Sequence, residues 1–569
     1  MKKQIVSLLL LLCMILSVFA LASCDKGNKE TDTTTAKANE PVASDTAVDT
    51  ANVLDEKWEK IAPKVKMITE KDRSLKIACD TSKNGVKKSA NDIYVAGPEE
   101  IVDDVTPKIE QMVYERNKAA CDLLGLTIEY DFWTQYYGQQ QSKIDLLVQG
   151  NAADAPDLFI CLLYDLNLEV LNGAFKDITS IPNSFFDFTT DGWYKTWMEN
   201  MSLTGDRAYV LGGDYFLELL RSVTVLPFNV ALMNANAATL AGAILEEGET
   251  LGAGETLAPR FFDLVERKEW TYDVLGKLCE AIWEDTDNDG QDSIGDRLGI
   301  LADEYGGKSA VGFIYSGGTP LTEVYTIEDE TSEYNGKQWI KFASDSETAG
   351  LNEIFDAVQS VFVGPGSLST SATHSSNTPE APGKAYHLTK FAQSQVLFLG
   401  VGLLGDLQDD TIQNMTDLYS VVPCPKVTVE QEYNSILDNT GDAGAINVKS
   451  NPRKARALSA YIQYCTEHSE KIREHFLEIV MKYNITTYDQ GTDRMLTIIY
   501  SHILYGRDKA VDDLFGVRDR DNRWHDLMKH AHHAEGASYI TSKYAAVLQS
   551  KQKALDDYLK TWYTLPTSN

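Results

Sequence analysis

The sequence contains few basic residues, no cysteine pair of the CxxC type and only one long apolar run. Its 52 Lys and Arg residues are outnumbered by 84 Asp and Glu residues, which gives a formal net charge of −32 at pH 7. Nucleic acids and anionic lipid headgroups bind basic surfaces, so this balance excludes both as partners. The sequence also lacks the GxSxG and HExxH motifs of serine hydrolases and zinc proteases.

The one long apolar run lies at the start of the chain. Lys2 and Lys3 precede apolar or small residues over 5–22, and the run closes on Leu-Ala-Ser-Cys at Cys24. An uncleaved membrane anchor is one interpretation, because the run is just long enough to span a bilayer. Small residues directly before a cysteine instead favour a cleaved signal over residues 1–23, and the four residues resemble a bacterial lipobox. We therefore predict that acylated Cys24 holds the protein on the extracytoplasmic face of the cell membrane.

The segment after this cysteine has the composition of a flexible tether. Residues 24–52 are rich in Thr, Ala, Asp and Lys and contain no aromatic residue. Such a segment cannot bury enough apolar surface to offset the entropy lost on ordering. The roughly 515 residues that follow exceed one ordinary hydrophobic core, so we expect at least two domains.

The remaining cysteines are expected to be buried free thiols. None has CxxC spacing, and most lie within apolar stretches. A disulfide stays possible, but its pairing cannot be assigned from the sequence. These cysteines are Cys79, Cys121, Cys161, Cys279, Cys424 and Cys465.

Strand-like and helix-like segments alternate along the body, which favours an α/β fold. A Ser, Thr, Gly and Pro-rich stretch predicts a long surface loop over residues 363–388, and the chain after Arg453 is expected to be mostly helical. The clearest elements are predicted helices over residues 109–124 and 139–148, and predicted strands over residues 74–78, 126–133 and 156–161.

Six phrases occur in the order found in extracellular solute-binding proteins, family 1, of ABC importers, the group that includes maltodextrin-binding proteins. No phrase is specific alone, but together the resemblance covers most of residues 74–470. The phrases are PDLFICLLYDLNLEVLNGAFKDIT (156–179), LPFNVALMNANA (226–237), WTYDVLGKLCEAIWEDTDNDGQDSIGDRLGI (270–300), FAQSQVLFLGVG (391–402), YSVVPCPK (419–426) and GAINVKSNPRKARALSAYIQY (444–464).

The resemblance implies a periplasmic-binding-protein-like fold of type II, in which two α/β lobes enclose a ligand cleft and are joined by crossing hinge segments. The first lobe would comprise residues 53–222 and 425–445. The second would comprise residues 223–424 and 446–569, including the C-terminal helices. Mapped onto this sequence, the crossing segments are residues 221–224, 421–425 and 444–447.

The function that the resemblance implies is binding rather than catalysis. Such a protein captures an extracellular solute, here expected to be an oligosaccharide, because a ligand that touches both lobes stabilises their closed state. It delivers the solute to the transmembrane subunits of an ABC permease and needs no catalytic cofactor. Two other functions stay open: a polysaccharide-degrading enzyme tethered in the same way, and a calcium-dependent surface adhesion module.

The resemblance also implies a set of ligand-site residues at strand ends and at the first crossing. Sugar sites combine aromatic faces with planar polar groups, because sugar rings have apolar C–H faces and a rim of hydroxyls. Ordinary core packing is the alternative for each aromatic residue. The family's stacking tryptophan falls at Leu403 or Leu404 here, which leaves the ligand class open. The candidates are Trp133, Leu163, Tyr164, Asp165, Tyr215, Arg221 and Leu404.

The acidic stretch DTDNDGQ has the spacing of a calcium-binding loop. Carboxylates at positions 1, 3 and 5 converge on one ion, Gly at position 6 permits a sharp turn, and position 7 supplies a carbonyl. Asp292 stands where an apolar residue is usual, and an Asp replaces the Glu at position 12. A structural Ca²⁺ site and a solvated acidic loop both stay open. The predicted ligands are Asp285, Asp287, Asp289, Gln291 and Asp296.

Two further motifs are weaker. Residues 400–405 satisfy GxGxxG after a strand-like run, but the polar sequence that follows has no apolar helical face, so close backbone packing explains the glycines better than a dinucleotide. Four histidines follow in RWHDLMKHAHHAEG, where a solvated surface explains them better than a metal site. They are His525, His530, His532 and His533.

Overall fold

The computed structural model divides the chain into two units, Met1–Asp55 and Glu56–Asn569. The description below concerns the second unit, so the predicted signal, Cys24 and the tether lie outside it. No helix among the described residues is long and apolar enough to cross a membrane. The structure describes residues 50–81, 90–102, 105–134, 139–150, 154–303, 308–318, 322–342, 349–370, 384–400, 402–482, 490–504, 510–511 and 537–565.

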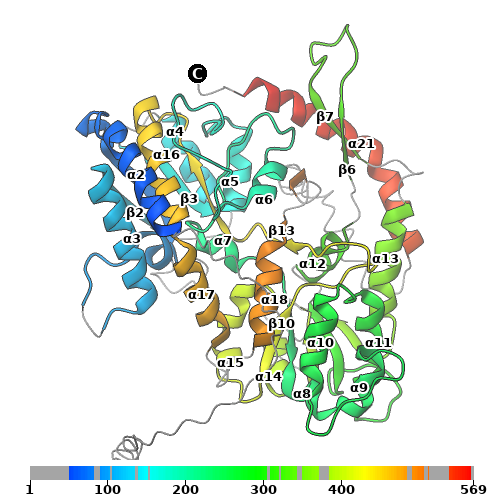
Figure 1. Ribbon diagram of the computed structural model, residues 1–569. Helices are drawn as coiled ribbons and strands as arrows, with labels where there is room; N and C mark the ends of the chain where they lie inside the picture. The colour runs from blue at the N-terminus through cyan, green and yellow to red at the C-terminus, as the bar shows by residue number, and fades with distance from the viewer. Residues whose placement is uncertain are drawn as a thin grey trace, which may run out of the picture. The chain divides into compact units, whose positions relative to one another are not determined.

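The first of two larger sheets has the strand order β12-β3-β1-β2 (Figure 1). Its strands β1, β2 and β3 are parallel, and β12 pairs antiparallel with β3. Every residue of β3 and β12 is buried, as their nearly continuous apolar sequences require for strands covered on both faces. The bounds are β1 Ser74–Thr81, β2 Thr127–Thr134, β3 Leu158–Leu162 and β12 Asp442–Ile446.

The second larger sheet has the order β10-β4-β9-β5-β8. Here β5 is parallel to β8 and β9, whereas β4 is antiparallel to β9 and β10. Strand β8 lies within the predicted loop over residues 363–388, and helix α14 (Lys384–Ala392) begins within it, so that prediction is wrong for these parts. Residues 371–383 lie outside the described residues. The bounds are β4 Leu226–Asn229, β5 Leu298–Asp303, β8 Ser367–Thr370, β9 Val396–Leu399 and β10 Tyr419–Val422.

Two small strand pairs complete the sheets. Strands β6 (Thr322–Thr326) and β7 (Gln338–Phe342) form an antiparallel hairpin. Strands β11 (Ser435–Ile436) and β13 (Ile503–Leu504) pair in parallel.

The helices that precede β4 in the chain, together with two that follow β12, accompany the first sheet. Local signals set their ends: α3 stops at Gly125, which has a φ of 67°, and the α16 N-terminus is capped by the Asn451 side chain. These helices are α2 Thr50–Lys66, η1 Glu70–Arg73, η2 Asp92–Ala96, α3 Lys108–Leu124, α4 Gln140–Gln149, α5 Leu163–Val170, α6 Lys195–Met201, α7 Leu217–Arg221, α16 Pro452–Glu467 and α17 Glu470–Lys482.

The remaining helices lie in chain segments that carry or follow the second sheet. Among them, α11 packs on β5, and α18 packs on β10 and α10. They are α8 Val230–Ala235, α9 Ala237–Ile244, α10 Leu257–Glu266, α11 Tyr272–Ile282, α12 Lys308–Ser316, α13 Ala349–Phe362, α14 Lys384–Ala392, η3 Leu404–Gln408, α15 Asp410–Gln413, α18 Gln490–Ser501 and α21 Ala537–Thr564.

Two extended segments cross side by side between the sheets. The amide of Thr224 donates to the carbonyl of Ile436 at 2.7 Å, and the amide of Asp438 donates to the carbonyl of Ser222 at 2.9 Å. Between them, Val223 and Leu437 form an antiparallel bridge. The first crossing therefore lies where it was predicted.

The other two predicted crossings are wrong. Residues 421–425 stay with the second sheet, because they continue β10 and Trp270 donates its indole N–H to the carbonyl of Pro423 at 2.9 Å. Residues 444–447 stay with the first sheet, because β12 pairs with β3. The return crossing is instead at residues 436–438.

The predicted boundary at residue 446 is wrong for the same reason. Helix α16 contacts α3 and β1, and α17 contacts α3, so both pack on the first sheet rather than the second. The face of α16 that carries Ala455, Leu458 and Ile462 is fully buried. The chain passes from α17 to α18 through residues 483–489, which lie outside the described residues.

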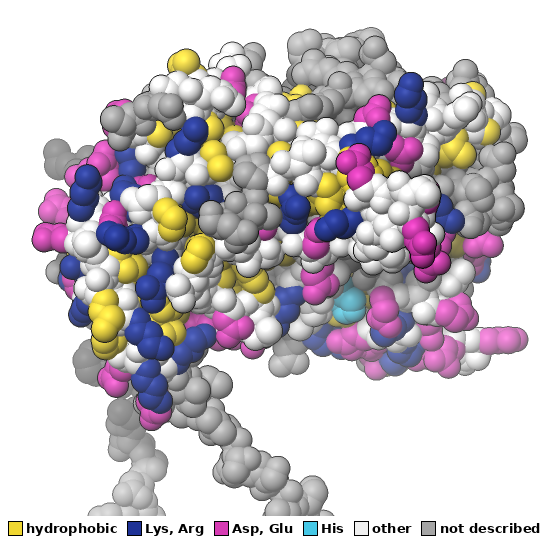
Figure 2. Space-filling model, turned by 90° about the horizontal axis from the view of Figure 1, so that it is seen from above, with side chains coloured by type: hydrophobic (Ala, Val, Ile, Leu, Met, Phe, Trp, Pro, Cys, Tyr) yellow, Lys and Arg dark blue, Asp and Glu magenta, His cyan; other side chains and the backbone are white. Residues whose placement is uncertain are grey.

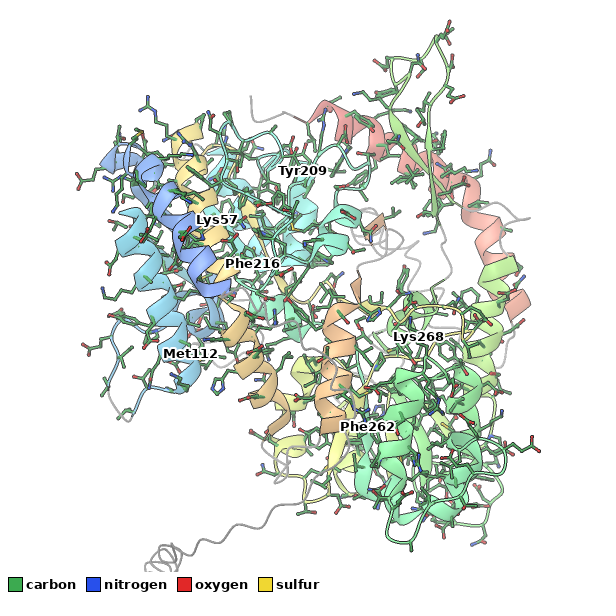
Figure 3. The ribbon with its side chains drawn as sticks, viewed as in Figure 1. Lys57, Met112, Tyr209, Phe216, Phe262 and Lys268 are labelled. Carbon is green, nitrogen blue, oxygen red and sulfur yellow. The ribbon has the colours of Figure 1, made fainter. Side chains whose placement is uncertain are left out.

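Each sheet has large buried aromatic side chains, and Phe216 and Phe262 mark them in Figure 3. Phe216 lies against β12, where a Cβ atom on Gly444 would stand 2.5 Å from its ring. Phe262 packs edge-on against Phe228 of β4, with ring centroids 5.7 Å apart. On the face in Figure 2, hydrophobic side chains form only small areas separated by charged ones.

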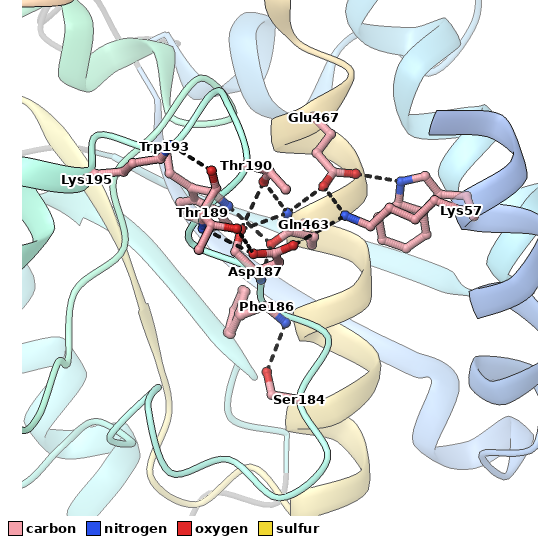
Figure 4. Close-up of polar contacts among 11 residues, drawn as sticks. Lys57, Ser184, Phe186, Asp187, Thr189, Thr190, Trp193, Lys195, Gln463 and Glu467 are labelled. Atoms are coloured by element: carbon pink, nitrogen blue, oxygen red, sulfur yellow. Dashed lines mark hydrogen bonds and ion pairs between the residues drawn. The ribbon is translucent and has the colours of Figure 1, made fainter. Parts of the chain in front are cut away.

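Helix α2, which follows the predicted tether, is fixed to α16 by a buried carboxylate (Figure 4). Glu467 accepts hydrogen bonds from the Lys57 ammonium at 2.6 Å and from the Trp58 indole at 2.7 Å. Gln463 also donates to Glu467 and accepts from the amide of Asp187, both at 2.8 Å. The network therefore joins α2, α16 and the loop before α6.

Candidate binding site

The carboxyl ends of β1, β2 and β3 meet at one edge of the first sheet, and β12 begins at the same edge. Ligands of α/β sheets bind outside this edge, which makes it the first place to look for a site. Four of the predicted site residues come together here. Trp133 ends β2, and Leu163, Tyr164 and Asp165 follow β3 directly.

Three buried carboxylates line this edge, and each accepts a hydrogen bond from a neighbouring element. Gln140 donates its side-chain amide to Asp80 at 2.8 Å, and the backbone amide of Gln141 donates to Asp165 at 3.4 Å. Asn91 donates its side-chain amide to Asp442 at 2.5 Å. The edge therefore presents oriented acceptors of the kind that bind hydroxyl groups.

The acidic edge also acts on the two thiols behind it. Burial raises the pKa values of the Cys79 and Cys161 thiols well above the usual value of a cysteine. The carboxylate of Asp80 raises both pKa values further. Asp442 contributes to both shifts. Both cysteines are therefore neutral thiols at physiological pH and unreactive as nucleophiles.

Several buried polar atoms at this edge have no hydrogen-bond partner among the described residues. They are the Asn91 Oδ1, the Trp133 Nε1 and both side-chain polar atoms of Asn167 on α5. These three residues are 0%, 2% and 1% exposed. A buried polar group left unpaired costs about 1–3 kcal/mol, so these atoms call for donors and acceptors that the described residues do not supply.

Trp133 does not offer an open ring face for stacking. The Lys143 ammonium lies 3.7 Å from its ring centroid, and Phe159 packs at 5.8 Å. Burial lowers the pKa of Lys143, although Asp131 and Asp80 oppose this shift. In this conformation both Lys143 and Phe159 pack on Trp133, so its ring offers no open sugar-stacking face.

Arg221 lies where the first crossing leaves α7, and it pairs with a buried carboxylate. Its Nη1 is 2.7 Å from Glu218, which also accepts from the amide of Ala90 at 2.7 Å. Burial raises the pKa of Glu218, and Arg221 opposes the rise. The Arg221 Nε and the Asp92 Oδ1 have no partner among the described residues.

Tyr94 links the ion pair of Arg221 and Glu218 to η3, in the chain segment that carries the second sheet. Burial raises the pKa of Tyr94 on η2, Glu218 raises it further, and a hydrogen bond with Gln408 of η3 opposes the rise. Leu404, at the start of η3, donates its amide to the carbonyl of Val223 at 2.8 Å. The polar residues therefore continue from the first sheet to η3 across the first crossing.

Tyr215 is set apart from the other candidates. It is fully buried, packs edge-on against Phe216 and Tyr461, and has the Arg116 guanidinium 5.0 Å from its ring centroid. Burial raises its pKa well above the usual value. These contacts are those of a core tyrosine behind the edge.

Sequence reasoning missed five residues of the site. Asp80 and Asp442 each border an apolar strand, which is a usable signal for a strand-end carboxylate. Nothing local marks the others, because their partners lie far away in the chain: Asn91 and Asp442 are separated by 351 positions. The missed residues are Asp80, Asn91, Gln140, Glu218 and Asp442.

The chain is similar over most of its length to solved structures of ABC-transporter solute-binding proteins. An ABC substrate-binding protein from Listeria monocytogenes in complex with cycloalternan is 12% identical, with a TM-score of 0.43 over 86% of this chain and 99% of that chain. A cyclic α-maltosyl-1,6-maltose binding protein from Arthrobacter globiformis is 11% identical, with a TM-score of 0.45 over 86% and 99%. A family 1 extracellular solute-binding protein from Bifidobacterium longum subsp. infantis is 12% identical, with a TM-score of 0.44 over 86% and 99%.

No protein-family model and no curated protein matches the chain. At these identities and TM-scores, the structural similarity leaves the family and the ligand of this chain open.

Part of the predicted calcium loop converges. One carboxylate oxygen from each of Asp285, Asp287 and Asp289 lies within 4.8 Å of the others. Asp296 does not join them, because its two oxygens accept from the backbone amides of Thr286 and Ser293, both at 2.8 Å. Asp296 fixes the loop backbone in this arrangement, and its role as a ligand stays a prediction.

The three converging carboxylates remain suited to Ca²⁺, which prefers oxygen ligands. Gly290, at the sixth position, has a φ of 75°, as the sharp turn of such a loop requires. The structure gives no metal-directed contact for the Gln291 carbonyl. The three oxygens would supply part of a coordination shell, and water would complete it.

The GxGxxG segment is a close-packing device. A Cβ atom on Gly402 would stand 2.0 Å from the carbonyl oxygen of Val225, and η3 rather than a long helix follows.

The six cysteines after Cys24 are free, and all except half-buried Cys121 are buried. The histidine cluster lies outside the described residues.

Proposed function

We propose that this protein is the lipid-anchored solute-binding component of an ABC importer and that it binds its solute at the carboxyl edge of the first sheet. The observation that carries the proposal is the set of unpartnered polar atoms of Asn91, Trp133 and Asn167, buried at this edge. The ordered phrases of the sequence give independent support. The Cys24 anchor would keep the body close to its permease.

The solute class that fits this edge is an oligosaccharide. Each sugar hydroxyl can donate to one group and accept from another, and the edge combines carboxylate acceptors with amide and indole groups. Asp80, Asp165 and Asp442 would accept from hydroxyls, and the Trp133 N–H would donate to one. A bound solute would pair the Asn91, Trp133 and Asn167 atoms that find no partner among the described residues.

Binding would be coupled to movement at the crossings. The polar residues reach from the first sheet to Gln408 on η3, so one ligand could touch segments of both sheets. A ligand that contacts both segments stabilises the arrangement that brings them together. This mechanism needs differential binding and neither a catalytic group nor a catalytic cofactor.

A thermal-shift screen of the full-length protein in detergent tests the proposal, because a ligand specific for the folded state raises the melting temperature. We expect a shift with an oligosaccharide from a panel of sugars, polyols and peptides. Asp165→Asn should weaken binding of that sugar about tenfold or more, because a hydrogen bond to a charged group is worth about 1.5–3 kcal/mol. Asp273→Asn, on the exposed face of α11, is the matched control.

Two outcomes would contradict the proposal. One is the absence of a shift with every solute. The other is release of reducing ends from a polysaccharide, which would favour the tethered-enzyme alternative.

The anchor has its own test. Metabolic labelling with a palmitate analogue should label the wild-type protein and fail to label Cys24→Ala. Label retained in that variant would contradict lipidation at this cysteine.

The proposal includes a structural Ca²⁺ ion held by Asp285, Asp287 and Asp289. It would stabilise the loop between α11 and β5 and take no part in solute binding.

A further inference from the structure

We infer that the C-terminal helix α21 is a strap that ties the two sheets together and limits their separation. Its contacts fall into two groups. One group is made with α13, which packs on α11 and β8 on the second sheet's side, and with the β6–β7 hairpin. The other is made with the loop between α6 and α7, which belongs to the first sheet's part of the chain. Figure 1 shows α21 in red, running past α13 and the hairpin.

The contact with the first sheet's side centres on Trp562, which is 1% exposed. Its indole N–H donates to the Thr204 hydroxyl at 3.1 Å, and its ring packs edge-on against Tyr209 at 5.1 Å. Tyr209, marked in Figure 3, is itself 2% exposed. The loop around it is held to the first sheet, since Leu211 donates its amide to the carbonyl of Gly444 in β12 at 2.7 Å and accepts from the amide of Gly444 at 3.0 Å.

An arginine caps the end of α21 from the same loop. Arg207 donates to the carbonyl oxygens of Trp562 at 3.3 Å and of Leu565 at 2.8 Å. The last carbonyls of a helix have no partner within the helix, and a cation there also meets the negative end of the helix dipole. The loop therefore holds this end of α21 by a buried ring and by two capping hydrogen bonds.

The contact with the hairpin is equally specific. Gln552 donates to the carbonyl of Ile340 at 3.1 Å and accepts from the amide of Phe342 at 2.8 Å. Trp339 donates its indole N–H to Asp556 at 2.9 Å, and its ring stacks on Tyr563 at 6.0 Å. These bonds lie on the successive turns of α21 that precede Trp562.

A rigid element fixed to both sides restrains any motion that separates them. The crossing segments at residues 222–225 and 436–438 are extended and can bend, whereas α21 is one continuous helix of 28 residues. Opening by rotation about the crossings would have to pull Trp562 away from Tyr209 or separate α21 from α13. This inference rests on the proposed function, because a strap matters only if the two sides move.

Distance measurements between spin labels on the two sides test the strap without any solute. Labels at Lys60→Cys on α2 and Lys277→Cys on α11 use side chains that are 77% and 59% exposed. The native thiols among the described residues would interfere little, because five are buried and burial raises the pKa of half-buried Cys121 to about 12. Cys121→Ser removes the remaining background.

We expect one narrow distance distribution in the otherwise wild-type protein and a distribution about twofold wider in Trp562→Ala. Lys560→Ala is the control, because that side chain lies on the same helix, is 51% exposed and forms an ion pair with Asp557 one turn away. If Trp562→Ala unfolds, Arg207→Met removes the capping hydrogen bonds, leaves the Trp562 ring in place and allows the same comparison.

Distributions of wild-type width in both Trp562→Ala and Arg207→Met would overturn the strap. Widening in Lys560→Ala as well would also overturn it, because the effect would then not depend on the contacts. A protein that binds no solute but still widens in Trp562→Ala would contradict the proposed function and leave the strap standing.

Discussion

Asp214 illustrates how one buried residue can make stability depend on pH. It is 1% exposed, and its carboxylate is 2.6 Å from Arg473 and accepts from the Tyr500 hydroxyl at 3.1 Å. Burial raises the pKa of Asp214 from 3.8 to about 6, and the attraction of Arg473 offsets only part of this. Tyr194 also faces the carboxylate, and Glu470 faces Arg473 from one turn away on α17.

The raised pKa predicts a pH window. Below pH 4 the carboxyl is protonated in both the folded and the unfolded chain. Between pH 4 and 6 the unfolded chain releases this proton first, so the folded state loses about 1.4 kcal/mol of stability per pH unit. We expect denaturant unfolding of Asp214→Asn to lack this part of the pH dependence. Asp206→Asn, at an exposed carboxylate, should retain it, and parallel profiles for wild type and Asp214→Asn would contradict the prediction.

Gly444 shows a steric demand of a single residue. A Cβ atom there would stand 2.5 Å from the ring of fully buried Phe216. Overpacking of this kind costs about 1–3 kcal/mol, so Gly444→Ala should lower the free energy of unfolding by that amount in a urea titration. Adding Phe216→Leu should restore part of it. A double variant that is less stable than both single variants would refute the steric explanation.

At the scale of elements, α2 depends on one buried carboxylate of α16. Glu467→Gln removes the ion pair with Lys57 but leaves an oxygen that can accept from Trp58. A hydrogen bond to a charged group contributes about 1.5–3 kcal/mol, so α2 should exchange its amide hydrogens faster in mass-spectrometric exchange measurements. Glu56→Gln is the control, because its pair with Lys60 is exposed and such pairs contribute little. Equal exchange in the two variants would show that packing alone holds α2.

The acidic loop between α11 and β5 predicts stabilisation by calcium. At a concentration about 100 times its Kd, an ion that binds only the folded state adds about 2.7 kcal/mol. We expect Ca²⁺ to raise the melting temperature and a chelator to reverse the rise. Asp287→Asn should abolish the effect, whereas Asp292→Asn should retain it because Asp292 lies outside the converging group. An equal rise in Asp287→Asn would place the ion elsewhere.

The elements themselves were largely predictable. Strands β1, β2 and β3 lie within the predicted strand segments or extend them, and α3 ends at the predicted glycine. The period of apolar residues is a local property, which explains this agreement. The prediction of a loop over residues 363–388 was wrong in part, because β8 is built from SLST, whose polar composition hides its pairing with β5.

At the scale of the whole molecule, the two adjacent crossings predict a bending motion. Residues 222–225 and 436–438 are joined by only a few backbone hydrogen bonds. A solute that touches both sides should therefore reduce the radius of gyration measured by X-ray scattering. Arg221→Met should weaken that reduction, because it removes the side chain that pairs with Glu218 at the first crossing. An unchanged radius with saturating solute would show that binding does not close the molecule.

The sequence by itself determined the α/β class, the position of the first crossing, and four residues that meet at the carboxyl edge of the first sheet, Trp133 and Leu163 to Asp165. The α/β class follows from periodicity and Trp133 from its place near a strand end, whereas the resemblance to the solute-binding family implied the first crossing and residues 163–165. Only the tertiary structure decided that β12, α16 and α17 return to the first sheet, that Asp442 faces Asn91, and that α21 spans both sides. Those outcomes depend on which distant apolar faces pack together, and the free energy of such packing is not encoded in any single segment.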